Sequence, residues 1–108
     1  MVARNPTSNV FGRRLREARE SLGIAQDKLG VMIGLDEGCA SARMSRYESG
    51  IHEPPHSTAQ KIAEALNVPP AYLHCEDDDL AELMRSFTQM NASQRKALLN
   101  FVRSLSAD

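Results

Sequence analysis

The apolar residues in the first half of the chain recur every three or four positions, a spacing typical of amphipathic helices. The pattern predicts three short helices, over residues 10–22, 26–33 and 40–49. Ser8 or Asn9 is placed to cap the first of them. A glycine, which tolerates the left-handed conformation that ends many helices, follows each helix: Gly23, Gly34 and Gly50.

The second half of the chain predicts further helices and no strand. The prolines at 54 and 55 require an extended link, after which Ser57 is placed to cap a fourth helix. A short helical turn over residues 70–74 and a helix over residues 78–90 follow. Ser93 is placed to cap a last helix, whose apolar positions are Leu98, Leu99, Phe101, Val102 and Leu105. The predicted fold class is therefore all-α.

Size and composition fit a small globular protein. The chain has 108 residues, of which 42% are hydrophobic and 25% charged. The start of the chain has no apolar signal region, and no apolar run approaches the length of a membrane span. A cytoplasmic location is therefore expected. Cys39 and Cys75 stand far apart and outside any metal-binding spacing, so two reduced thiols are expected.

Charge is divided unevenly along the chain. The formal net charge is −1, whereas nucleic-acid-binding proteins are often strongly basic. Residues 1–52 hold 8 basic and 6 acidic side chains, and residues 53–108 hold 5 and 8. This asymmetry weakly favours a DNA-facing first half and an acidic second half that points away.

The predicted third helix has the composition of a DNA-reading helix. Ala40, Met44 and Tyr47 form its inward stripe. Small side chains on the other side allow the backbone to approach base edges, and arginine supplies paired donors to guanine. The outward residues are Ser41, Ala42, Arg43, Ser45, Arg46 and Ser49.

Three stretches of the chain together resemble a known family. They read LREARESLGIAQDKLGVMIGL, MSRYESGIHEPP and IAEALNVPPAYL. This order resembles the lambda-repressor/Cro-like helix-turn-helix transcriptional regulators, and the resemblance covers roughly residues 11–73. It implies a five-helix DNA-binding domain, and the two additional C-terminal helices predicted from the apolar pattern lie outside it. The expected parts are an arm (1–9), the DNA-binding domain (10–75) and a C-terminal helical dimerisation extension (76–108).

The resemblance also implies residue roles. Ser41, Ala42 and Arg46 match base-reading positions, with Arg43 and Ser45 beside them. Arg19 and Glu48 match a salt bridge between the first and third helices. The expected phosphate contacts are Arg14, Arg19, Gln26, Lys28, Ser49 and His52, although Arg14 is equally compatible with a solvated face that pairs with nearby glutamates.

The sequence departs from the family pattern at several positions. Ala25 stands where a capping side chain is usual, Gly30 where alanine is common, and Glu53 where a basic residue often contacts phosphate. The segment between Leu35 and Glu48 is about four residues longer than usual. The extra residues either lengthen the turn or add a turn to the recognition helix.

The two last helices need a surface on which to bury their apolar stripes. They either pack on the DNA-binding domain or on a second copy of the chain. We expect a homodimer joined through Leu98, Leu99, Phe101, Val102 and Leu105, which would suit a palindromic operator in double-stranded DNA.

Other functions are less well supported by the sequence. An antitoxin of a toxin–antitoxin pair and an interaction module without DNA binding remain alternatives. No phosphate loop, metal-spaced cluster or paired acid and base indicates an enzyme or a cofactor, and no ligand domain indicates a small-molecule sensor. The acidic run at 76–79 fits either a cation site or negative charge at a helix start, and the second is favoured.

Overall fold

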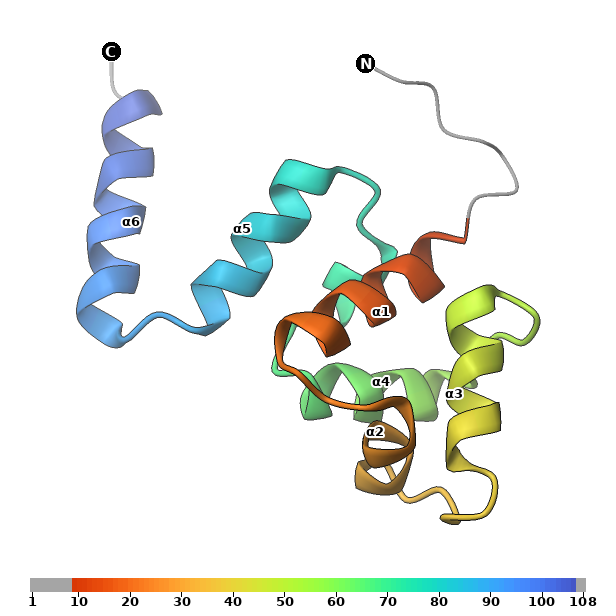
Figure 1. Cartoon of the computed structure of the whole chain (residues 1–108). Coiled ribbons are helices and arrows are strands. Elements are labelled where there is room, and N and C mark those ends of the chain that lie inside the picture. Colours follow the sequence, from red (N-terminus) through yellow and green to blue (C-terminus); the bar gives the residue numbers. More distant parts are fainter. Residues whose placement is uncertain (1–8, 107–108) are drawn as a thin grey trace.

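The computed structural model describes residues 9–106, which form helices and no strand. The first helix, α1 (Val10–Ser21), packs across α3 (Ala40–Ser49), and α2 (Gln26–Met32) packs against the same helix. α4 (His56–Ala65) and the short 3₁₀ helix η1 (Pro70–His74) pack with these three helices (Figure 1). Residues 10–74 are called the head below. The predicted all-α class is confirmed.

The head has one apolar core, made by the inward stripes of its helices. Leu15 of α1, Leu29 of α2 and Met44 of α3 are each 0% exposed. Ile62 of α4 and Tyr72 of η1 close the core from the other side. Burial raises the pKa of Tyr72. The helical spacing of apolar residues in the sequence therefore marks the core correctly.

Two glycines allow α3 to lie close to its neighbours. A Cβ atom at Gly30 would lie 2.6 Å from the Cβ of Ala40, at the crossing of α2 and α3. A Cβ atom at Gly12 would overlap the carbonyl oxygen of Glu48 and lie 2.7 Å from its carbonyl carbon. Because the obstacle at Gly12 is backbone, the crossing of α1 and α3 depends on a residue without a side chain.

Gly12→Ala is expected to lower the free energy of unfolding by about 2 kcal/mol or more, despite the better helix propensity of alanine. The matched control is Gly38→Ala, because an added Cβ there meets no atom within 4 Å. The control should change stability by less than about 0.5 kcal/mol. Chemical denaturation of both variants measures the difference, and equal stabilities would show that α1 and α3 separate without cost.

The longer segment before α3 forms a turn and adds no residues to the helix, and α3 has 10 residues. Residues 33–39 connect Met32 to Ala40, and the Leu35 amide donates to the Gly30 carbonyl at 2.9 Å. The Cys39 amide donates to the Asp36 carbonyl at 3.0 Å. Of the two alternatives for the extra residues, the structure shows the lengthened turn.

One helix start agrees with the sequence expectation and two differ from it. Asn9 caps α1 and accepts from the Gly12 amide at 3.0 Å, as one of the two proposed caps. The prediction that Ser57 caps α4 is wrong, because α4 begins at His56 and Pro55 occupies the cap position. Ser93 is also wrong as a cap, because Asn91 and Gln94 each accept from the other's amide, at 2.8 and 2.9 Å.

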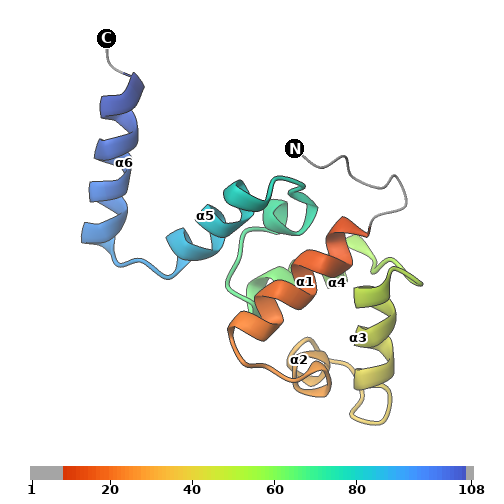
Figure 2. The same ribbon diagram turned by 45° about the horizontal axis from the view of Figure 1, so that its top comes forward.

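The last two helices extend from the head. α5 (Asp78–Thr88) ends two residues earlier than expected and buries Ala81 against the head, while none of the fifteen residues of α6 (Ala92–Ser106) is buried. Figures 1 and 2 both show α6 standing away from the head. The radius of gyration is 15.7 Å, against about 13 Å for a compact chain of this length.

The acidic run before and at the start of α5 has defined contacts. Asp77 caps the helix by accepting from the Leu80 amide at 2.9 Å. Asp78 accepts from Arg13 at 2.9 Å and from Arg14 at 2.8 Å. These two hydrogen bonds hold the pKa of Asp78 below its ordinary value of 3.8. Both aspartates therefore place negative charge at the start of α5, which is the favoured interpretation of the acidic run.

Within the described residues, no helix combines the length and the apolar character needed to cross a bilayer.

Candidate nucleic-acid interface

α3 lies at the edge of the head (Figures 1 and 2), and most of its exposed side chains are polar. Ala40, Met44 and Tyr47 bury the inward side of the helix, as the sequence predicts. All residues proposed to read bases are exposed, and the face combines small side chains with two guanidinium groups. These residues are Ser41, Ala42, Arg43, Ser45 and Arg46, with Ser49 at the end of the helix.

Glu48 holds α3 to the two preceding helices. Its carboxylate accepts from Arg19 Nε at 2.6 Å and from Arg19 Nη2 at 3.2 Å, so the expected ion pair is present as a two-point contact. The Arg19 and Glu48 side chains are only 11% and 7% exposed, and the hydrogen bond with Glu48 raises the pKa of Arg19. Such a paired, shielded contact fixes the orientation of α3 more firmly than a surface ion pair does.

Gln26 belongs to the same cluster. Its side-chain nitrogen donates to Glu48 Oε1 at 3.1 Å, which joins the start of α2 to the end of α3. Arg19 also donates to the Ile24 carbonyl at 2.8 Å, so the turn between α1 and α2 is tied to this point. Gln26 is predicted from the sequence to contact phosphate, and the sequence does not predict its contact with Glu48. Lys28, another proposed phosphate contact, is exposed on α2.

Arg14 is buried between α1 and the segment before α5. Its side chain is 1% exposed and donates to the carbonyls of Cys75 at 2.7 Å and Glu76 at 3.1 Å. It also donates to Glu17 at 2.7 Å and Asp78 at 2.8 Å. Burial works against the charge, but the hydrogen bonds to Glu17 and Asp78 outweigh it and raise the pKa of Arg14.

The expectation that Arg14 contacts phosphate is therefore corrected. Its guanidinium is buried and already donates to four acceptors, so it cannot reach the outside of the head. The signal was present in the sequence, because position 14 lies three residues after Phe11 and four before Ala18. On a helix this spacing places Arg14 within the apolar stripe.

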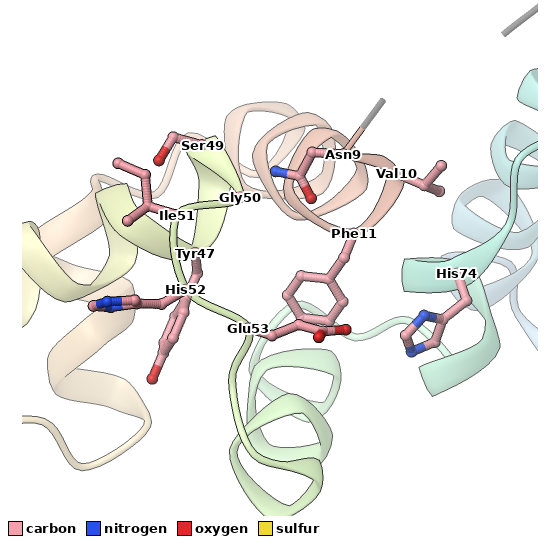
Figure 3. Close-up of a pocket in the computed structure, with 10 residues that line it drawn as sticks. All are labelled: Asn9, Val10, Phe11, Tyr47, Ser49, Gly50, Ile51, His52, Glu53 and His74. Carbon is pink, nitrogen blue, oxygen red and sulfur yellow. The ribbon is translucent and has the colours of Figure 1, made fainter. Parts of the chain in front are cut away.

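The segment after α3 lies beside the start of α1. Asn9 donates to the Glu48 carbonyl at 2.8 Å, and the His52 amide donates to the Arg46 carbonyl at 3.3 Å. Figure 3 shows a pocket between this segment and His74 of η1, with Phe11 of α1 between them. Ser49 and His52, both proposed to contact phosphate, are exposed and line this pocket.

Comparison with known proteins identifies relatives of the head. Residues 15–73 match the helix-turn-helix family. Two curated relatives are each 34% identical over 68 residues, which is 63% of this chain. They are an "Uncharacterized HTH-type transcriptional regulator" from Sinorhizobium medicae (strain WSM419) and "Uncharacterized HTH-type transcriptional regulator R00410" from Rhizobium meliloti (strain 1021). The aligned part spans 46% of each relative's length.

A solved structure is similar over most of the chain. The transcriptional regulator BswR superposes with a TM-score of 0.79 at 41% sequence identity, over 86% of this chain and 92% of that one. The alignment therefore reaches beyond the head. With the geometry of α1 to α3 and the match over residues 15–73, these likenesses establish that the chain belongs to the lambda-repressor/Cro-like helix-turn-helix family of transcriptional regulators.

Proposed function

We propose that this protein is a sequence-specific transcriptional regulator that binds double-stranded DNA and inserts the outward face of α3 into the major groove. The observation that carries this proposal is the exposed face of α3, where Arg43 and Arg46 stand among small side chains. The major groove admits one helix, and a guanidinium can donate two hydrogen bonds to a guanine edge.

The contacts around Glu48 support the same function. A helix that reads bases must enter the groove at a defined angle, since specific contacts depend on the register of the protein on the duplex. Arg19, Gln26 and Asn9 all bind the end of α3, through the side chain or the carbonyl of Glu48. The exposed face of α3 is therefore held rigidly before DNA arrives.

Phosphate contacts from the flanking segments would complete the interface. Lys28 of α2 and Ser49 and His52 at the end of α3 are exposed, and Gln26 and Arg19 contact Glu48 near that end. We assign them to the DNA backbone, which fixes the register without reading sequence. The same proposal includes a homodimer on a palindromic operator, action as a repressor and location in the cytoplasm.

The test is a fluorescence anisotropy titration with DNA from upstream of the protein's own gene, at 50 and 200 mM salt, with a scrambled duplex as competitor. With about six phosphate contacts per complex, the affinity should fall about 10³-fold between the two salt concentrations. The specific duplex should keep its binding in excess scrambled DNA. Equal weak binding to both duplexes, followed by failure to enrich any site from random DNA, would contradict sequence-specific binding.

A further inference from the structure

The outward face of α3 carries donors for guanine but no side-chain amide for adenine. Arg43 and Arg46 are exposed there, and a guanidinium donates two hydrogen bonds to guanine. Adenine is read mainly by asparagine or glutamine, and α3, with the sequence ASARMSRYES, contains neither. Gln26 of α2 already donates to Glu48 at 3.1 Å. Recognition of an A·T base pair is therefore left largely to apolar contact with the methyl group of thymine, which lies in the major groove.

Ile51 is a large apolar side chain at the end of α3. It directly follows Gly50, the residue that ends the helix, and it is 70% exposed. Figure 3 shows the Ile51 and His52 side chains on the same side of this segment, away from Phe11. Ala42 is also exposed on α3, but its side chain is a single methyl group. An isoleucine that packs against DNA buries more apolar surface than an alanine does, and it contributes correspondingly more to affinity.

The backbone on either side of Ile51 is held in place. A single exposed apolar side chain is common on proteins and assigns no function by itself. Here, however, the Gly50 amide donates to the Tyr47 carbonyl at 3.4 Å, and the His52 amide donates to the Arg46 carbonyl at 3.3 Å. Gly50 has a φ of 83°, the left-handed conformation that turns the chain at this point. The position of Ile51 is therefore fixed relative to the last turn of α3.

We propose that Ile51 reads a thymine, by packing its side chain against the 5-methyl group of that base in the major groove. This methyl group lies on the side of the base that faces its own strand's backbone, so a side chain beside phosphate contacts can reach it. Ser49 and His52, which we assign to phosphate, are exposed just before and just after Ile51 in the chain. This role rests on the proposed binding of DNA through α3, and it adds a preference for thymine at one position of each half-site.

A double-mutant cycle between protein and DNA tests this contact. The specific duplex is first defined with the wild-type chain, by titration or by selection from random DNA. Each thymine is then replaced in turn by deoxyuridine, which pairs in the same way but lacks the methyl group. At one thymine of each half-site the wild type should lose affinity about three- to fivefold, the effect of one buried methyl group. Ile51→Ala should bind the thymine and deoxyuridine duplexes equally at that position.

The matched control is Leu80→Ala, which also shortens an exposed apolar side chain. Leu80 is 48% exposed on α5, and α5 lies away from α3 in Figures 1 and 2. This control should respond to every deoxyuridine as the wild type does. Circular dichroism checks that both variants are folded.

Three results would overturn the role of Ile51 while the DNA-binding function stands. The first is an equal loss of affinity for the wild type and Ile51→Ala at every replaced thymine. The second is a specific site that contains no thymine. The third is an Ile51→Ala variant that binds the specific and scrambled duplexes equally more weakly, which would place Ile51 on the DNA backbone. A wild-type chain that prefers no duplex would overturn the proposed function and the role of Ile51 together.

Discussion

Replacing Arg46 by alanine is expected to weaken binding of the specific DNA site at least about 30-fold and to leave the stability of the fold unchanged. Arg46 is exposed on the outward face of α3, and its side chain takes no part in the core. A good paired contact to a base is worth about 1–3 kcal/mol. A dimer loses it in both half-sites, and these losses add roughly, so about 2 kcal/mol is the lower limit.

The charge-matched control for Arg46→Ala is Lys61→Ala, because Lys61 is an exposed cation on α4, outside the proposed DNA surface. Both proteins are titrated against specific and scrambled duplexes at one salt concentration. Arg46→Ala should lose affinity mainly for the specific duplex, whereas Lys61→Ala should bind both like the wild type. If Arg46→Ala weakens both duplexes equally, Arg46 binds phosphate and does not read a base.

Replacing Arg14 by alanine is expected to lower the free energy of unfolding by about 3 kcal/mol. Arg14 is 1% exposed and joins α1 to the segment before α5 through the Cys75 and Glu76 carbonyls. Removal of one member of a buried charged cluster costs about 3–5 kcal/mol when both partners are shielded. The lower end applies here, because the carboxylates of Glu17 and Asp78 are 39% and 70% exposed.

In a chain of this size a loss of about 3 kcal/mol corresponds to a fall in melting temperature of about 15 °C. Arg16→Ala on the same helix is the control, because Arg16 is 65% exposed and pairs only at the surface with Glu20 at 3.3 Å. It should change the free energy of unfolding by less than about 1 kcal/mol. Similar melting curves for the two variants would mean that Arg14 contributes no more than a surface arginine does.

The apolar periodicity of the sequence is sufficient to predict the helices and the core of the head. Leu15, Met44 and Ile62 occupy positions at helical spacing, and all three are fully buried. The helix starts are harder to predict, because several residues near each start can serve as caps. At α6 the serine at position 93 competes with Asn91, and Asn91 caps the helix since Gln94 follows three residues later and completes a reciprocal pair.

The residues proposed for the DNA interface could also be predicted only in part. The exposed face of α3 follows from the spacing of its buried residues, so the positions of Ser41 and Arg46 on that face were predictable. Arg14 was misplaced because a basic residue on a helix is ordinarily solvated, and its burial depends on carbonyls at Cys75 and Glu76, more than 60 residues away. The helical spacing places position 14 in the apolar stripe of α1, but the sequence does not show that acceptors so distant along the chain come to lie beside it.

The lengthened turn at residues 33–39 bears on how proteins of this shape diversify. Both of its ends are anchored, by the Leu35 amide on one side and the buried Ala40 on the other. The entropic cost of a longer loop grows slowly, by only about 0.6 kcal/mol for each doubling of its length. Insertions and deletions can therefore accumulate in this turn during evolution while α3 keeps its position. The length of this segment is a poor guide to evolutionary relationship, and the residues that flank it are a better guide.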